Sequence, residues 1–165
     1  MRNLNQLFVF TNSRKIREFN ASFNDELIPK SLSIAEFSKK AVFVNGRFEC
    51  DSTYALVLMN RACASVKEAN SVLKIPTEFF EFLKNNDYLF SFFKELAISK
   101  KSIEEIKFND IYADFEEHLS ILEAVLKEYE SLLDKEDLYD DITLPKIYSI
   151  NEAYIRSFSE ITLHI

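Results

Sequence analysis

The clearest pattern in the chain is a short apolar run followed by polar residues and then by apolar residues at helical spacing. Residues 7–10 (LFVF) are continuously apolar, as expected of a strand that is buried on both faces of a sheet. Residues 11–13 (Thr, Asn, Ser) are all good helix N-caps, and apolar residues then recur at Ile16, Phe19 and Phe23. The pattern predicts a strand, a tight turn and a helix, which is the usual opening of an α/β domain.

A second strand pattern lies at the far end of the sequence. Ile161, Leu163 and Ile165 alternate with polar residues, which is typical of a strand. We expect this strand to lie beside residues 7–10 in one sheet. Because the sequence stops inside a strand-like pattern without a polar tail, we also expect it to be a fragment of a longer protein.

Most of the remaining sequence is helical in pattern. Ser33 and Glu36 form a capping box, which predicts a short helix over about residues 34–40. Residues 41–44 (AVFV) fit either another strand or the end of that helix. Asn45-Gly46 is the strongest turn signal in the chain.

From residue 51 to 155 apolar residues follow helical spacing almost throughout. Thr77 is the expected cap of a helix bearing Phe79, Phe80 and Leu83, and a second phenylalanine-rich helix is predicted over about residues 87–98. Aromatic residues can stack on nucleic-acid bases, but at this spacing we interpret them as core. Ser102 and Glu105 form another capping box.

The longest predicted helix begins near Asp110. Its apolar residues recur every three or four positions, as in a helix packed along one stripe. They are Ile111, Phe115, Leu119, Leu122, Leu126, Tyr129 and Leu133. Packing within the chain is the preferred interpretation, and a coiled-coil dimer is the alternative.

These elements predict an α/β fold that is predominantly helical, with a small parallel sheet made by both chain ends. Residues 1–47 form the N-terminal α/β part, residues 48–155 an inserted helical subdomain, and residues 156–165 the returning strand. Pro145 and Asn151 are typical boundary residues and indicate short helices before that strand.

Composition narrows the class of protein. The chain has 165 residues, and a hydrophobic fraction of 47% excludes disorder. A net charge of −7 argues against a dedicated nucleic-acid coat but permits a local basic patch. No apolar run approaches the roughly 20 residues that cross a bilayer, and no secretory signal precedes the first strand, so we expect a cytoplasmic protein without membrane contact.

The candidates for catalysis and cofactor binding are few. Gly46 is the single glycine, so the glycine-rich loops that hold nucleotide phosphates and the GxSxG nucleophile elbow are missing. Cys50 and Cys63 are expected to be buried or half-buried free thiols. Paired carboxylates such as Asp140-Asp141 are interpreted as solvated, and the two histidines as surface or packing residues. We therefore expect no catalytic residue, no metal site and no cofactor in this part of the protein.

One segment has a functional interpretation that competes with a structural one. Exposed amides at a helix N-terminus attract anions, and cationic side chains there suit a phosphate backbone. The candidate nucleic-acid-binding residues are Asn12, Ser13, Arg14, Lys15 and Arg17. The alternative is that these residues are simply solvated on the outer face of the first helix.

Three segments resemble AddB-type subunits of bacterial helicase-nucleases, the first two their N-terminus and the third their helical region. In that family an apolar strand runs into a Ser-x-Arg-like turn, and a Leu-Pro-containing segment and a Leu-Tyr-Asp segment follow further on. The residues that carry the resemblance are Ser13, Arg14, Arg17, Ile28, Pro29, Leu32, Ser33, Ile34, Glu36, Phe37, Leu138, Tyr139, Asp140, Leu144 and Pro145.

The resemblance implies a degenerate P-loop-helicase-like domain in which the helical part is an insertion. Such a domain would act as a DNA-handling scaffold in an AddB/RecB-type exonuclease and helicase that takes part in double-strand break repair and recombination. DNA and an AddA-like helicase-nuclease subunit would be its partners. The alternative is a helical protein-interaction module without a nucleic-acid role, which would dock through the helix at 110–133.

Overall fold

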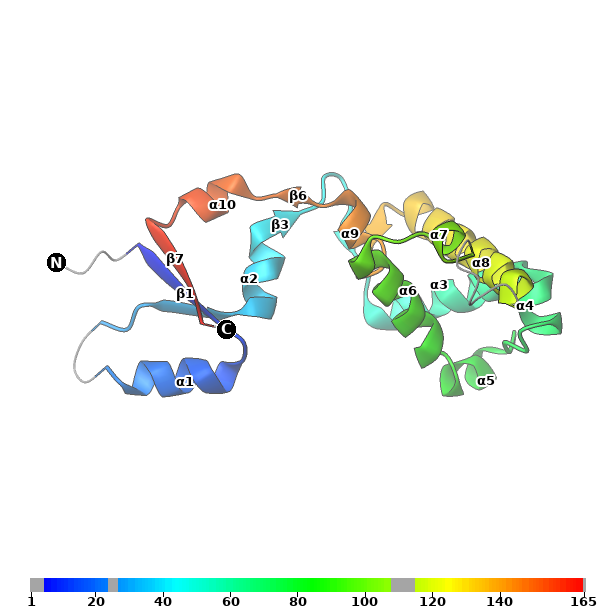
Figure 1. Ribbon diagram of the computed structural model, residues 1–165, viewed down its shortest axis with the longest axis horizontal. Coiled ribbons are helices and arrows are strands. Elements are labelled where there is room, and N and C mark those ends of the chain that lie inside the picture. Colours follow the sequence, from blue (N-terminus) through cyan, green and yellow to red (C-terminus); the bar gives the residue numbers. More distant parts are fainter. Residues whose placement is uncertain (1–4, 24–26, 108–114, 165) are drawn as a thin grey trace. The chain divides into compact units, whose positions relative to one another are not determined.

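The computed structural model describes residues 5–23, 27–107 and 115–164. It divides into two compact units, which are described separately (Figure 1). The sheet unit comprises residues 1–45 and 148–165, and the helical unit comprises residues 46–147. This division assigns residues 148–155 to the sheet unit, whereas the sequence analysis assigned them to the helical subdomain.

A three-stranded parallel sheet forms the centre of the sheet unit. Its middle strand, β1 (Gln6–Phe10), pairs with β2 (Lys30–Ser33) on one side and with β7 (Glu160–His164) on the other. Leu7 lies opposite Ile161 in the β1–β7 register. The expected pairing of the two ends of the sequence is therefore confirmed, and so is the coarse α/β class (Figure 1).

The alternation of side chains along β1 explains why residues 7–10 of this strand are all apolar. Phe8 and Phe10 point to one face, where each ring centroid lies 5.0 Å from that of Phe19 on α1 (Ser13–Ala21). Leu7 and Val9 point to the opposite face and are 0% and 2% exposed. Both faces of β1 are thus covered, as is usual for a parallel sheet.

Strand β2 was not among the elements that the sequence analysis predicted. The segment reads KSLS, and only Leu32 in it is apolar. Its strand conformation comes from the ladder with β1, in which Leu32 lies opposite Val9. An edge strand of this length carries too few apolar positions to produce an alternating pattern.

The capping box predicted at Ser33 is confirmed at the start of α2 (Ile34–Ala41). The Ser33 hydroxyl accepts a hydrogen bond from the Glu36 amide at 3.3 Å, and the Glu36 carboxylate accepts one from the Ser33 amide at 2.9 Å. The bonded carboxylate is favoured in its charged form, so the hydrogen bond from the Ser33 backbone lowers the pKa of Glu36.

Replacing Ser33 by alanine should lower the free energy of unfolding by about 1 kcal/mol, because the amide at the third helical position loses its acceptor. Chemical denaturation followed by circular dichroism measures the change. Ser38→Ala is the matched control, because the Ser38 hydroxyl only donates within the same helix, to the Ile34 carbonyl. Equal losses of stability for the two substitutions would show that the cap stabilises the protein no more than the Ser38 hydrogen bond does.

A second, antiparallel ribbon extends the sheet unit. It joins β3 (Val42–Phe43) to β6 (Ser149–Ile150), and α10 (Glu152–Arg156) follows it and contacts α2. Both readings of residues 41–44 are partly right, because α2 ends at Ala41 and β3 begins at once. The turn signal also holds: Gly46 has φ +68°, a conformation that glycine adopts without strain.

The helical unit contains helices of very different lengths and one short parallel ribbon. The ribbon pairs β4 (Phe48–Glu49) with β5 (Leu138–Tyr139). The helices are α3 (Ser52–Ser65), α4 (Lys67–Ser71), α5 (Phe79–Lys84), α6 (Asp87–Ser99), α7 (Ile103–Lys107), α8 (Glu116–Lys135) and α9 (Leu144–Ile147). Within the described ranges, none of the helices combines the length and apolar character needed to span a bilayer.

Helix α8 is the long amphipathic helix that the sequence predicted, and it packs within the chain against α3. Leu119, Tyr129 and Leu133 are buried in the core as expected. Phe115 is exposed, and the predicted start of the helix at residues 110–114 lies outside the described residues. Because the buried stripe of α8 already forms the core, this face is not free for the docking role considered above.

The two phenylalanine-rich helices are α5 and α6, and α5 differs from the prediction in its cap and in the exposure of its phenylalanines. Helix α5 is capped by Glu78, whose carboxylate accepts from the Glu81 amide at 2.9 Å, and not by Thr77. Phe82 is its buried residue, whereas Phe80 is 71% exposed. The core interpretation is therefore right for α6, where Phe93 is buried, and only partly right for α5.

Candidate functional site

The turn singled out by the sequence lies at the carboxyl end of β1, the middle strand of the sheet. Asn12 has an extended backbone and is the N-cap of α1. Its side-chain oxygen accepts a hydrogen bond from the Lys15 amide at 3.0 Å. This cap fixes where the helix begins and how its first residues are presented. Ligands of parallel sheets bind at this end of the strands.

The five predicted site residues lie between positions 12 and 17, and all of them are exposed. Asn12 is used structurally as the cap, and Ser13 begins the helix. Arg14 donates from Nε to the Glu18 carboxylate at 3.0 Å, one helical turn along. Such an exposed pair is weak, so Arg14 can exchange it for another anion. Lys15 and Arg17 have no ion pair within the described part of the chain.

The neighbouring helix N-terminus differs in its charge. Strand β2 leads into α2, whose first turn contains the Glu36 carboxylate of the capping box. The first turn of α1 contains no acidic residue. Since β1 and β2 are parallel, both helix starts lie toward the same edge of the sheet. An anion is therefore favoured at α1 and disfavoured at α2.

The end of β7 contributes an aromatic residue to this edge. His164 lies opposite Phe10 in the register, and the two rings stack with centroids 4.7 Å apart. This histidine is a packing residue, as the sequence analysis expected. Among the described residues, the edge thus offers helix amides and cationic side chains, which can hold a phosphate, and no nucleophile activated by a base.

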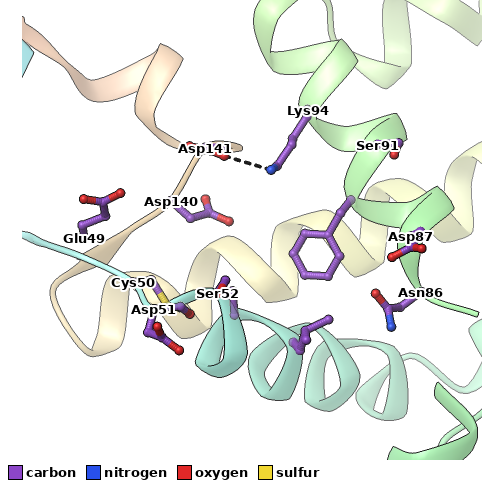
Figure 2. A pocket seen from close by; sticks show the side chains of 13 residues that line it. Glu49, Cys50, Asp51, Ser52, Asn86, Asp87, Ser91, Lys94, Asp140 and Asp141 are labelled. Carbon is purple, nitrogen blue, oxygen red and sulfur yellow. Dashed lines mark hydrogen bonds and ion pairs between the residues drawn. The ribbon is translucent and has the colours of Figure 1, made fainter. Parts of the chain in front are cut away.

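A second candidate site, which the sequence analysis missed, is a pocket of about 940 Å³ in the helical unit (Figure 2). Its walls come from three segments: residues 49–56 at the start of α3, residues 86–94 at the start of α6, and residues 140–141 after β5. Pairing of β4 with β5 brings the first and third segments together, because Glu49 lies opposite Tyr139.

Local capping orders the first of these walls. The Asp51 carboxylate accepts from the Thr53 amide at 2.8 Å and so caps α3. This backbone hydrogen bond also lowers the pKa of Asp51, which keeps the side chain negatively charged.

Asp140 in the third wall is held by its neighbours. It accepts a hydrogen bond from the Tyr129 hydroxyl at 2.6 Å, and its other oxygen accepts from the amides of Ile142 and Thr143. Burial, followed by the charge of Asp140, raises the pKa of Tyr129. The interpretation of Asp140-Asp141 as a solvated pair is thus wrong for Asp140, which is half-buried and structural.

The charge of the pocket is mainly negative. Carboxylates come from Glu49, Asp51, Asp87, Asp140 and Asp141. Among the described lining residues the one cation is Lys94, whose Nζ lies 2.8 Å from the Asp141 carboxylate (Figure 2). Such a lining suits a positively charged group and opposes phosphate.

The cysteines are unsuited to nucleophilic chemistry. Both are free and buried, as expected. Burial raises the pKa of Cys50 to about 11, with further contributions from Asp140, Asp51 and Glu136. Burial alone raises the pKa of Cys63 to about 12. Each side chain is thus a neutral thiol near neutral pH. In the described ranges, no three or more His, Cys, Asp and Glu side chains are grouped so that they could hold a metal ion.

Comparisons of the chain with models of protein families, with curated proteins and with solved structures each find no match.

Proposed function

We propose that the sheet unit contacts the phosphate backbone of DNA through the N-terminus of α1. The supporting observation is the exposed cationic group of Arg14, Lys15 and Arg17, which directly follows the middle strand of a parallel sheet. Helix amides and cationic side chains act together on phosphate oxygens and position a protein on nucleic acid without reading its sequence.

The wider context of this proposal is the resemblance to AddB. We propose that the chain is the non-catalytic, helicase-like N-terminal part of an AddB/RecB-type nuclease that acts with an AddA-like subunit in double-strand break repair. The residues Ser13, Arg14 and Arg17 carry this resemblance at the turn. A parallel sheet that includes both ends of the sequence, with helices in between, supports the proposal because an inserted helical subdomain requires that topology.

Exchanging Arg14, Lys15 and Arg17 together for alanine should weaken DNA binding and flatten its salt dependence. Each phosphate contact that is lost lowers the slope of log affinity against log salt by about 1, so the triple variant should lose up to about 3. Fluorescence anisotropy with a labelled duplex that carries a single-stranded end, measured over a series of salt concentrations, gives both quantities.

The control is a variant with the same change of net charge in the helical unit. Lys67, Lys101 and Lys135 are exposed, and their joint replacement by alanine should change the slope much less. All six exchanged side chains are on the surface, so circular dichroism should show folded protein in both cases. Equal slopes for the two triple variants would contradict the proposal for this turn.

A variant with the opposite sign sharpens the test. Glu18→Gln removes the carboxylate that pairs with Arg14 and should therefore strengthen DNA binding, by up to about fivefold at low salt. The effect should vanish in the background of Arg14→Ala. Strengthening that persists without Arg14 would indicate a general effect of net charge.

A further inference from the structure

The pocket of the helical unit has a lining that no role in DNA binding explains. We infer that it binds an organic cation, namely a primary ammonium or guanidinium group carried on an apolar stem. Such a ligand could be a free amine or a basic side chain of another protein, and the chemistry of recognition is shared by both.

The first observation is a side-chain acceptor that lines the pocket and receives no hydrogen bond from the described residues. Asn86 is only 5% exposed, and its Nδ2 donates to the carbonyl oxygens of Phe82 and Leu83 at 3.3 and 2.9 Å. These two bonds fix the amide with its oxygen toward the pocket (Figure 2). No described residue donates a hydrogen bond to this oxygen. This oxygen opens onto the pocket, where a ligand donor can reach it.

The second observation is the surrounding negative charge. Asp87 begins α6 next to Asn86 and has no ion pair within the described residues. Asp51 lines the pocket from the start of α3 and is held in its charged form by its capping bond. A cation between these walls gains from both carboxylates, whereas an anion is repelled by both.

The third observation is the ammonium that already lies in the pocket. Lys94 extends from α6 and its Nζ reaches the Asp141 carboxylate. Its side chain is 42% exposed, so the pair is open to exchange with another cation. The pocket thus already holds an ammonium group beside one of its carboxylates.

The wall between the acceptors suits the stem of the ligand. Leu56 and Phe90 line it, and both are half-buried. Methylene groups can pack on these side chains, and the ring of Phe90 can also attract a nearby cation. An inorganic ion would make no use of this apolar wall.

Isothermal titration of the whole 165-residue chain at low ionic strength tests the inference. The probes are Nα-acetyl-arginine amide, spermidine and a short acetylated and amidated peptide with one central arginine, and Nα-acetyl-citrulline amide is the neutral analogue of Nα-acetyl-arginine amide. We expect the cations to bind and Nα-acetyl-citrulline amide not to bind. Tighter binding of the peptide than of Nα-acetyl-arginine amide would identify a protein side chain as the ligand, and tighter binding of spermidine a free amine. Absence of binding by all three cations, or binding of inorganic phosphate instead, would overturn the inference.

Variants locate the binding in the pocket and predict opposite signs. Asp51→Asn keeps a capping oxygen and Asp87→Asn changes an exposed side chain, so both should fold, and each should weaken cation binding by up to about fivefold. Lys94→Met removes the resident competitor and should strengthen it. Glu95→Gln, on the same helix but outside the lining, should leave it unchanged. Weaker binding by Lys94→Met, or equal effects of Asp87→Asn and Glu95→Gln, would also overturn the inference.

Discussion

Replacing Phe93 by alanine should lower the free energy of unfolding by about 3–5 kcal/mol. Phe93 lies on α6, is 0% exposed and belongs to the core cluster of the helical unit. Truncation removes the transfer free energy of the ring and leaves a cavity that the surrounding helices can fill only in part. Urea denaturation followed by circular dichroism measures the loss.

Phe80 provides the matched control, because the substitution is the same and the environment is opposite. Its side chain is 71% exposed at the start of α5, so Phe80→Ala should change the free energy of unfolding by less than about 0.5 kcal/mol. Losses of similar size at the two positions would contradict the assignment of Phe93 to the core and of Phe80 to the surface.

This pair also shows what the sequence could and could not predict about the core. Spacing indicated that both phenylalanine-rich segments are helices, and they are α5 and α6. Helix α5 has only a single turn and a half, and phenylalanines occupy several of its sides. Periodicity within so short an element cannot select the buried face. Which face of α5 is buried depends on its contacts with α3, a separate helix earlier in the sequence.

The sheet shows the same limit for a different reason. Strand β1 was predictable because it contains a short continuous apolar run, and β7 because its apolar and polar residues alternate. Strand β2 was not, because its conformation is imposed by the ladder with β1 and its own residues are mainly polar. A short edge strand of this kind can therefore be recognised only from the strand that it pairs with.

The two candidate sites differ in the same respect. The residues of the α1 turn are contiguous, so a strand followed by an N-cap and cations could be recognised in the sequence. The pocket is assembled from segments that lie far apart, and its acidic residues had separate local explanations. Asp51 caps a helix and Asp140 orders a turn, so only the fold shows that both line one pocket.

The distribution of charge reconciles a net charge of −7 with a proposed DNA contact. The cationic turn belongs to the sheet unit, whereas the acidic pocket belongs to the helical unit. Net charge alone would argue against any phosphate contact. At moderate salt, charges are screened over about 10 Å, so a phosphate bound at α1 would respond mainly to the side chains close to it. The two proposals therefore concern ligands of opposite charge, and an experiment can contradict one without contradicting the other.

Raising the pH from about 9 to about 12 should remove up to about 4 kcal/mol of stability through Cys63 alone. Burial raises the pKa of this thiol from 9.0 to about 12 in the folded chain. Above pH 9 the unfolded chain therefore loses the thiol proton while the folded chain keeps it, and ionisation draws the equilibrium toward unfolding. The contribution is fully present below the unfolded pKa and is lost as the pH rises through the folded one.

Cys63→Ala isolates this contribution, because alanine has no proton to lose. The substitution leaves a small cavity, so the variant should be less stable than the natural chain at pH 7. Its free energy of unfolding should nevertheless fall less steeply above pH 9, by about 1.4 kcal/mol for each pH unit. Tyr129, whose pKa is also raised by burial, contributes equally to both proteins and cancels in the comparison. Parallel curves for the two proteins would mean that the Cys63 thiol reaches solvent in the folded state, and the core around α3 would then be looser than its 1% exposure indicates.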